Sequence, residues 1–187
     1  MWATELSASG RYIAGLNVLD DHRALQEELA RTGELPTVSY QVVLWENDDT
    51  QIAQVAEITV QAPLLTDIFA IFDLKFSPDE TLLAVREDGL VRVLRVPTLE
   101  TEQIIEAPSE QSLFYDELAW SADSRYLAFN DDDLALSVWD RQTGAIHTSS
   151  NNRELAGPIT AVPEGWIVKQ LMFLKKIGNS FVPVTCW

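Results

Sequence analysis

The chain has 187 residues, of which 47% are hydrophobic. This content is ample for a packed core and excludes an intrinsically disordered protein. Its 29 acidic and 13 basic residues give a formal charge of −16. That balance excludes nucleic acid and anionic membrane surfaces as partners, because both are bound through clustered lysine and arginine. The length predicts one domain over residues 1–187.

Cysteine content and the apolar segments bear on the compartment. Cys186 is the one cysteine of the chain, so the fold does not depend on an internal disulfide. Met1–Glu5 has neither the basic nor the apolar region of a secretory leader. The longest apolar stretch, Trp166–Ile177, is interrupted by lysines and is too short to span a bilayer. We therefore expect a cytoplasmic protein.

The first predicted unit covers residues 3–62. It opens with a hairpin, Leu6–Ala14, in which a polar turn begun by serine separates two short apolar segments. Gln41–Trp45 predicts a third strand and Ile52–Val60 a fourth. The second hairpin is longer than that of the later units by roughly 25 residues, which indicates an insertion.

The inserted residues, Asp20–Gly33, predict a short helix. Asp20 or Asp21 is suited to cap its free amides. Leu25 and Leu29 lie one turn apart and form a narrow apolar stripe. The glycine at the end of the segment can adopt the left-handed conformation that stops a helix.

The second and third units, residues 70–107 and 115–150, repeat this pattern. Phe76–Ala84 and Trp120–Ala128 match the first hairpin, and Ser77 and Ser121 begin their polar turns 44 positions apart. That spacing is typical of repeats built from four strands, which recur at about 40–45 residues.

After the third unit the pattern weakens. Pro158–Val162 and Trp166–Val168 predict another hairpin, and Asn179–Trp187 predicts a further strand. We expect an imperfect fourth unit over residues 157–187. The sequence thus predicts an all-β fold: a β-propeller-like array of about four four-stranded antiparallel blades, with a short helical insertion in the first blade.

At these residues the chain resembles the WD-repeat β-propeller family. Val138–Asp140 carries the Trp-Asp ending of a third strand, and Leu44–Glu46 is a close variant. Phe76–Asp79 is similar to a turn common in these repeats and in Tol-type propellers. The resemblance covers residues 3–170 apart from the insertion. It implies a non-catalytic protein–protein interaction scaffold, with protein partners and no cofactor.

The chain departs from the WD pattern in two respects. The Gly-His dipeptide that opens many WD repeats is absent, and neither His22 nor His147 stands in its place. The hydrogen-bonded tetrad of the family is therefore incomplete. WD propellers usually have seven blades, so four blades leave three alternatives open. These are a compact four-bladed ring, an array that pairs with itself or another chain through open blade edges, or part of a longer protein. An accessory propeller of a multi-subunit enzyme is a further alternative.

No residue pattern predicts catalysis or metal binding. Asp131–Asp133 lacks the spacing of a calcium loop and is expected to be a solvated turn. His22 and His147 are too few for a zinc site, and nothing near Cys186 activates it as a nucleophile. We expect no enzyme activity.

Candidate contact residues come from the helix and the chain ends. Four tryptophans fall at repeat-equivalent apolar positions and are expected in the core: Trp45, Trp120, Trp139 and Trp166. Loops and insertions on a stiff scaffold are common recognition elements. The predicted protein-interaction residues are those on the exposed helix face and the terminal tryptophans: Arg23, Gln26, Glu27, Arg31, Trp2 and Trp187.

Overall fold

The computed structural model describes residues 3–34, 36–63, 73–87, 90–106, 118–130, 136–148, 159–162, 165–168, 172–177 and 180–185, the last four ranges through their backbone. In these residues the chain is mostly β-strand, with one helix between the second and third strands. The expected all-β class is therefore confirmed.

The strands form four antiparallel sheets of four strands, each a meander in chain order. The first sheet contains β1 (Ala3–Leu6), β2 (Tyr12–Val18), β3 (Thr37–Asn47) and β4 (Ile52–Pro63). The second contains β5 (Leu74–Phe76), β6 (Leu82–Glu87), β7 (Leu90–Arg95) and β8 (Thr101–Glu106). The third contains β9 (Leu118–Trp120), β10 (Tyr126–Asn130), β11 (Leu136–Asp140) and β12 (Ile146–Thr148).

The fourth sheet has a full set of strands where the sequence predicted an imperfect unit. It contains β13 (Ile159–Val162), β14 (Gly165–Val168), β15 (Met172–Ile177) and β16 (Ser180–Thr185). The sequence does not predict β15 as a strand. The reason is that its residues continue an apolar run, and a run of this kind hides the period-two alternation that identifies a half-buried strand.

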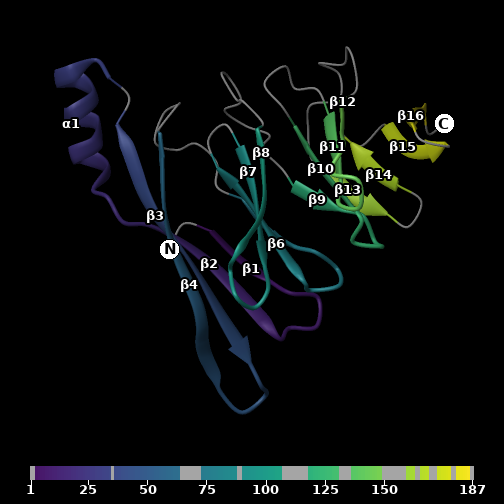
Figure 1. Cartoon of the computed structure of the whole chain (residues 1–187), viewed down its shortest axis with the longest axis horizontal. Coiled ribbons are helices and arrows are strands. Elements are labelled where there is room, and N and C mark those ends of the chain that lie inside the picture. The colour runs from purple at the N-terminus through teal and green to yellow at the C-terminus, as the bar shows by residue number, and fades with distance from the viewer. Residues whose placement is uncertain are drawn as a thin grey trace.

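Successive sheets meet through their first strands. β1 contacts β5, β5 contacts β9, and β9 contacts β13. The fourth strands lie outermost: β12 is exposed throughout and β8 at all positions but one. In Figure 1 the sheets follow one another in chain order, and the first and fourth sheets lie at opposite ends of the array. The described residues of these two sheets therefore do not meet to close a ring.

The core lies between the faces of neighbouring sheets. Tyr12, Ala14 and Leu44 of the first sheet pack with Leu83 and Leu94 of the second. The next layer joins the second and third sheets and contains Leu82, Ala84, Val91, Val93, Trp120, Leu127, Phe129 and Trp139. Alternate residues of β6 enter the two layers, so this strand is buried on both faces.

The helix α1 (His22–Thr32) lies in the connection between β2 and β3, where the insertion was expected. The Asp21 carboxylate caps it by accepting from the amide of Arg23 at 2.8 Å, and the Gly33 amide donates to the carbonyl of Leu29 at 2.8 Å. Gly33 has φ 71°, the left-handed conformation that glycine adopts without strain. Leu25 packs against Val38 and anchors the helix to β3.

Candidate interaction surfaces

Three hairpin turns share one structure, stabilised by a serine. The Oγ of this serine accepts from the amide five residues later, at 3.0, 3.0 and 2.8 Å in the three sheets. Its own amide donates to the carbonyl of that same residue at 2.9, 2.9 and 2.8 Å. The serines are Ser7, Ser77 and Ser121. Because the side chain satisfies a backbone amide inside the turn, the turn is held in one conformation.

The fourth position of each turn has a positive φ: 78° at Gly10, 57° at Glu80 and 58° at Ser124. In the second and third turns this residue also accepts a hydrogen bond from the preceding turn. The amide of Ser9 donates to Oε1 of Glu80 at 2.5 Å. The amide of Asp79 donates to Oγ of Ser124 at 2.9 Å. We call this repeated contact the turn latch, and it joins each described turn to the next.

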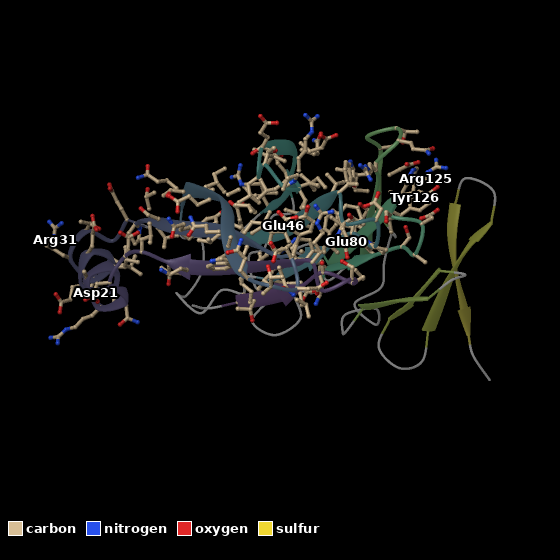
Figure 2. All side chains as sticks on the ribbon, turned by 90° about the horizontal axis from the view of Figure 1, so that it is seen from below. Asp21, Arg31, Glu46, Glu80, Arg125 and Tyr126 are labelled. Carbon is tan, nitrogen blue, oxygen red and sulfur yellow. The ribbon has the colours of Figure 1, made fainter. Side chains whose placement is uncertain are left out.

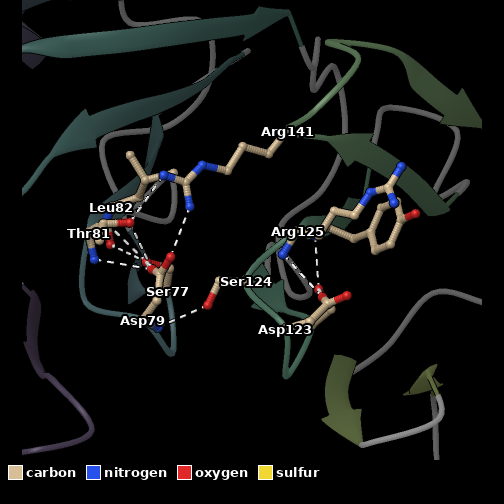
Figure 3. A network of polar contacts seen from close by, with 10 residues as sticks. Ser77, Asp79, Thr81, Leu82, Asp123, Ser124, Arg125 and Arg141 are labelled. Atoms are coloured by element: carbon tan, nitrogen blue, oxygen red, sulfur yellow. Dashed lines mark hydrogen bonds and ion pairs between the residues drawn. The ribbon is translucent and has the colours of Figure 1, made fainter.

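The turns of the second and third sheets are linked by a wider polar network (Figure 3). Arg141, after β11, donates through Nη1 to Asp79 at 3.0 Å and through Nη2 to Oγ1 of Thr81 at 3.1 Å. Desolvation would raise the pKa of Asp79, but hydrogen bonds from Ser77, Thr81 and Arg141 outweigh it and lower the pKa. The Asp79 carboxylate therefore stays ionised and joins the two sheets.

Asp140, the aspartate of the Trp-Asp pair, is held by an arginine. Arg125 donates to its two oxygens at 3.1 and 2.8 Å. This hydrogen bonding lowers the pKa of Asp140 to about 2. The Arg125 guanidinium also lies 4.8 Å from the ring centre of Tyr126. The arginine therefore fixes the position of the Asp140 carboxylate.

The first sheet repeats this arrangement. Arg11 pairs with Glu46 at 2.7 Å and lies 5.0 Å from the ring centre of Tyr12. The second sheet differs, because Thr81 stands at the arginine position and Arg95 at the acidic one, where it pairs with Glu102. The polar side chains of this turn surface are therefore engaged with one another and stiffen it.

A buried charged pair lies at the other end of the second sheet. The Glu87 side chain is fully buried and accepts from Nε and Nη2 of Arg92 at 2.5 and 3.2 Å. Burial raises the pKa of the Tyr40 hydroxyl, and the neighbouring Glu87 carboxylate raises it further. The Glu87 carboxylate and the Arg92 guanidinium thus satisfy one another close to the Tyr40 phenol. We attribute a structural role to them.

The four predicted helix residues, Arg23, Gln26, Glu27 and Arg31, are all exposed on α1. Arg23 and Glu27 form an ion pair at 2.9 Å with side chains 85% and 68% exposed, and a pair so solvated contributes little to stability. Figure 2 shows α1 at one end of the molecule, with Arg31 pointing outward.

Several predicted residues fall outside the described part of the chain. They are Trp2, Trp187, Cys186, the run Asp131–Asp133 and the side chains of His22 and Trp166. His147 lies exposed on β12. Within the described residues, no three His, Cys, Asp or Glu side chains are grouped as a metal ion would require.

The tryptophans behave differently from one another. Trp120 and Trp139 are 4% and 3% exposed and pack edge to face with ring centres 6.3 Å apart. The expected core role is therefore right for both of them. It is wrong for Trp45, which is only partly buried because no described sheet covers its face.

The turn latch is not predicted from the sequence. The repeat identifies the serines of the turns, but it points to no role for Ser9, Asp79, Glu80 or Ser124. No local pattern signals these contacts, because each joins the third position of one turn to the fourth position of the next, and the two turns meet only when the sheets stack.

Compared with known protein families and with characterised proteins, the chain matches none of them. In the described part of the chain, no helix has the length and apolarity needed to cross a membrane.

Proposed function

We propose that this chain is a WD-repeat-type β-propeller array that acts as a non-catalytic protein–protein interaction scaffold. The observation that carries the proposal is α1, a capped helix that is anchored to β3 through Leu25 and exposes Arg23, Gln26, Glu27 and Arg31 on its other face. An exposed helix face on a stiff sheet is suited to recognition, because little conformational entropy is lost when a partner binds it.

The propeller architecture is supported by the order of strands in each sheet. First strands contact one another from sheet to sheet, and fourth strands lie outside. This is the radial order of propeller blades, with first strands around the axis. The turn latch supports it too, because the same contact joins sheets one to two and two to three.

A scaffold role is supported by how the polar side chains are used. The charged residues of the turn surface pair among themselves, as Arg125 does with Asp140 and Arg141 with Asp79. Paired groups of this kind hold neighbouring sheets in position. The single cysteine agrees with a cytoplasmic scaffold.

The partner surface is assigned to Arg23, Gln26, Glu27 and Arg31. The experiment compares the proteins captured by the wild type, by the double variant Arg23→Glu/Arg31→Glu and by the control Ile146→Glu, whose residue is exposed on β12. Each captured protein is then purified and its affinity measured by calorimetry. The proposal requires a protein whose affinity falls at least about tenfold, the equivalent of 1.4 kcal/mol, in the helix variant alone. Equal affinity for all three forms would refute it.

A further inference from the structure

One row of apolar residues recurs at the same register in three sheets. It runs across the first three strands, and its members are direct cross-strand partners. We call it the seam row. Its members are Leu6, Ile13 and Trp45 in the first sheet, Phe76, Leu83 and Leu94 in the second, and Trp120, Leu127 and Trp139 in the third.

In the second and third sheets the seam row is buried against the preceding sheet. Leu83 and Leu94 are 0% exposed and pack on the first sheet. Trp120, Leu127 and Trp139 pack on the second. The row is therefore the surface by which each of these two sheets packs against the preceding sheet.

The first sheet carries the same row with no described sheet to cover it. Leu6 is 59% exposed, whereas Phe76 at the equivalent position is 8% exposed. Ile13 and Trp45 are partly buried. The opposite face of this sheet already packs on the second sheet through Tyr12, Ala14 and Leu44. An aromatic and two aliphatic side chains in cross-strand register thus form an open apolar face.

The turn of the first sheet differs from the other two at the latch position. Glu80 and Ser124 accept the latch through their side chains, whereas Gly10 has no side chain to do so. A sheet that packed on the first sheet would therefore be held by the seam row without the latch. A joint of this kind depends on apolar packing alone and is suited to reversible association.

We propose that a second copy of this chain packs its fourth sheet on the seam row of the first sheet. At the seam between the first and second sheets and at the seam between the second and third, the row is covered by a four-stranded sheet of this same chain. The fourth sheet lies at the opposite end of the array (Figures 1 and 2). Two of the cross-strand pairs between β14 and β15 join apolar residue types, Trp166 with Leu174 and Ile167 with Phe173.

Two such joints related by a two-fold axis close the arrays of two copies into one ring, in which both ends of each array are covered. This inference rests on the propeller architecture proposed above. It assigns self-association to blade faces and not to blade edges.

Charge opposes this association. Each copy carries −16, so two copies repel one another over a Debye length of about 10 Å at 0.1 M salt, which falls to about 3 Å at 1 M. The apolar joint gains from added salt, because screening removes repulsion without weakening the packing. The dimer is therefore tighter at high salt, which is the opposite of a joint made of ion pairs.

The test measures mass by light scattering over a range of protein concentrations, at low and high salt. The wild type is expected to dimerise, more tightly at 1 M salt. Trp45→Glu and Leu6→Glu raise the dissociation constant at least about thirtyfold, as loss of a central interface side chain does, with an unchanged circular dichroism spectrum. The control is Ile104→Glu, since Ile104 is 46% exposed on β8 outside the row.

A second measurement identifies the contacting sheet. A photo-crosslinking amino acid replaces Leu6, and a mixture with isotope-labelled chain separates links between copies from links within one. The proposal requires links to residues 159–185 of the other copy. Links to residues 3–63 of the other copy, or a monomer at all concentrations and salts, overturn it. A monomer that still binds a protein through α1 leaves the scaffold proposal standing, so the two failures are distinguishable.

Discussion

Replacing Leu83 with alanine tests whether the first and second sheets pack face to face. Leu83 is 0% exposed and lies at the centre of the seam row of the second sheet, between its cross-strand neighbours Phe76 and Leu94. Strand pairing holds the backbones of both neighbours, so the side chains around the deleted group can relax only in part. Loss of about three methylene-sized groups costs about 2 kcal/mol in transfer free energy.

The cavity left behind adds to this cost, and Leu→Ala substitutions in rigid cores destabilise by about 3–5 kcal/mol in total. We expect Leu83→Ala in the upper half of that range. The matched control is Ile104→Ala on β8, where the side chain is 46% exposed. This variant loses little burial and should cost less than about 1 kcal/mol.

The free energy of unfolding is measured by urea titration, followed by far-ultraviolet circular dichroism and by tryptophan fluorescence. An array of sheets need not unfold in one step. If the two signals do not coincide, the free energy of the first unfolding transition is compared between the variants and the wild type. If Leu83→Ala lowers the free energy of unfolding no more than Ile104→Ala does, Leu83 does not lie between packed sheets. The seam row could then no longer be regarded as the packing surface between neighbouring sheets.

Three further predictions concern the helix cap, the latch and acid stability. Asp21→Ala removes the N-cap and should destabilise the helix by about 1 kcal/mol, seen as a smaller circular dichroism signal at 222 nm; an unchanged signal contradicts the cap. Ser124→Ala leaves the Asp79 amide without its acceptor, so hydrogen exchange at that amide should accelerate, and unaltered protection contradicts the latch. Asp140 has a pKa lowered to about 2 from an ordinary 3.8 by the Arg125 hydrogen bond. Its contribution is present above about pH 4 and is lost as the pH falls toward 2. Asp140→Asn should therefore flatten the dependence of unfolding free energy on pH in that window, and an unchanged slope contradicts the pairing.

Local structure could be predicted from the sequence wherever it depends on residues close together in the chain. The turn serines appeared as a repeat because each bonds an amide only five residues away. The helix boundaries were readable for the same reason, since Asp21 and Gly33 satisfy groups within one turn of themselves. Between the two candidate caps the structure selects Asp21, and Asp20 instead accepts from the amide of Ser39 in β3. That contact spans the insertion and leaves no local signal.

The candidate surfaces were readable only in part. The exposed face of α1 followed from helical periodicity, and its residues are exposed as expected. The turn latch was not readable, because Asp79 and Ser124 are brought together only when the second and third sheets stack.

By itself the sequence determined the strands of the first three sheets, their shared turns, the helix and its caps, because these depend on alternation and on hydrogen bonds over a few residues. The tertiary structure alone decided which apolar rows are covered. Leu6 and Trp120 occupy the same position of the same hairpin pattern, yet one is 59% and the other 4% exposed. The physical reason is the order of the sheets. Trp120 packs against the second sheet, whereas no described sheet precedes the first.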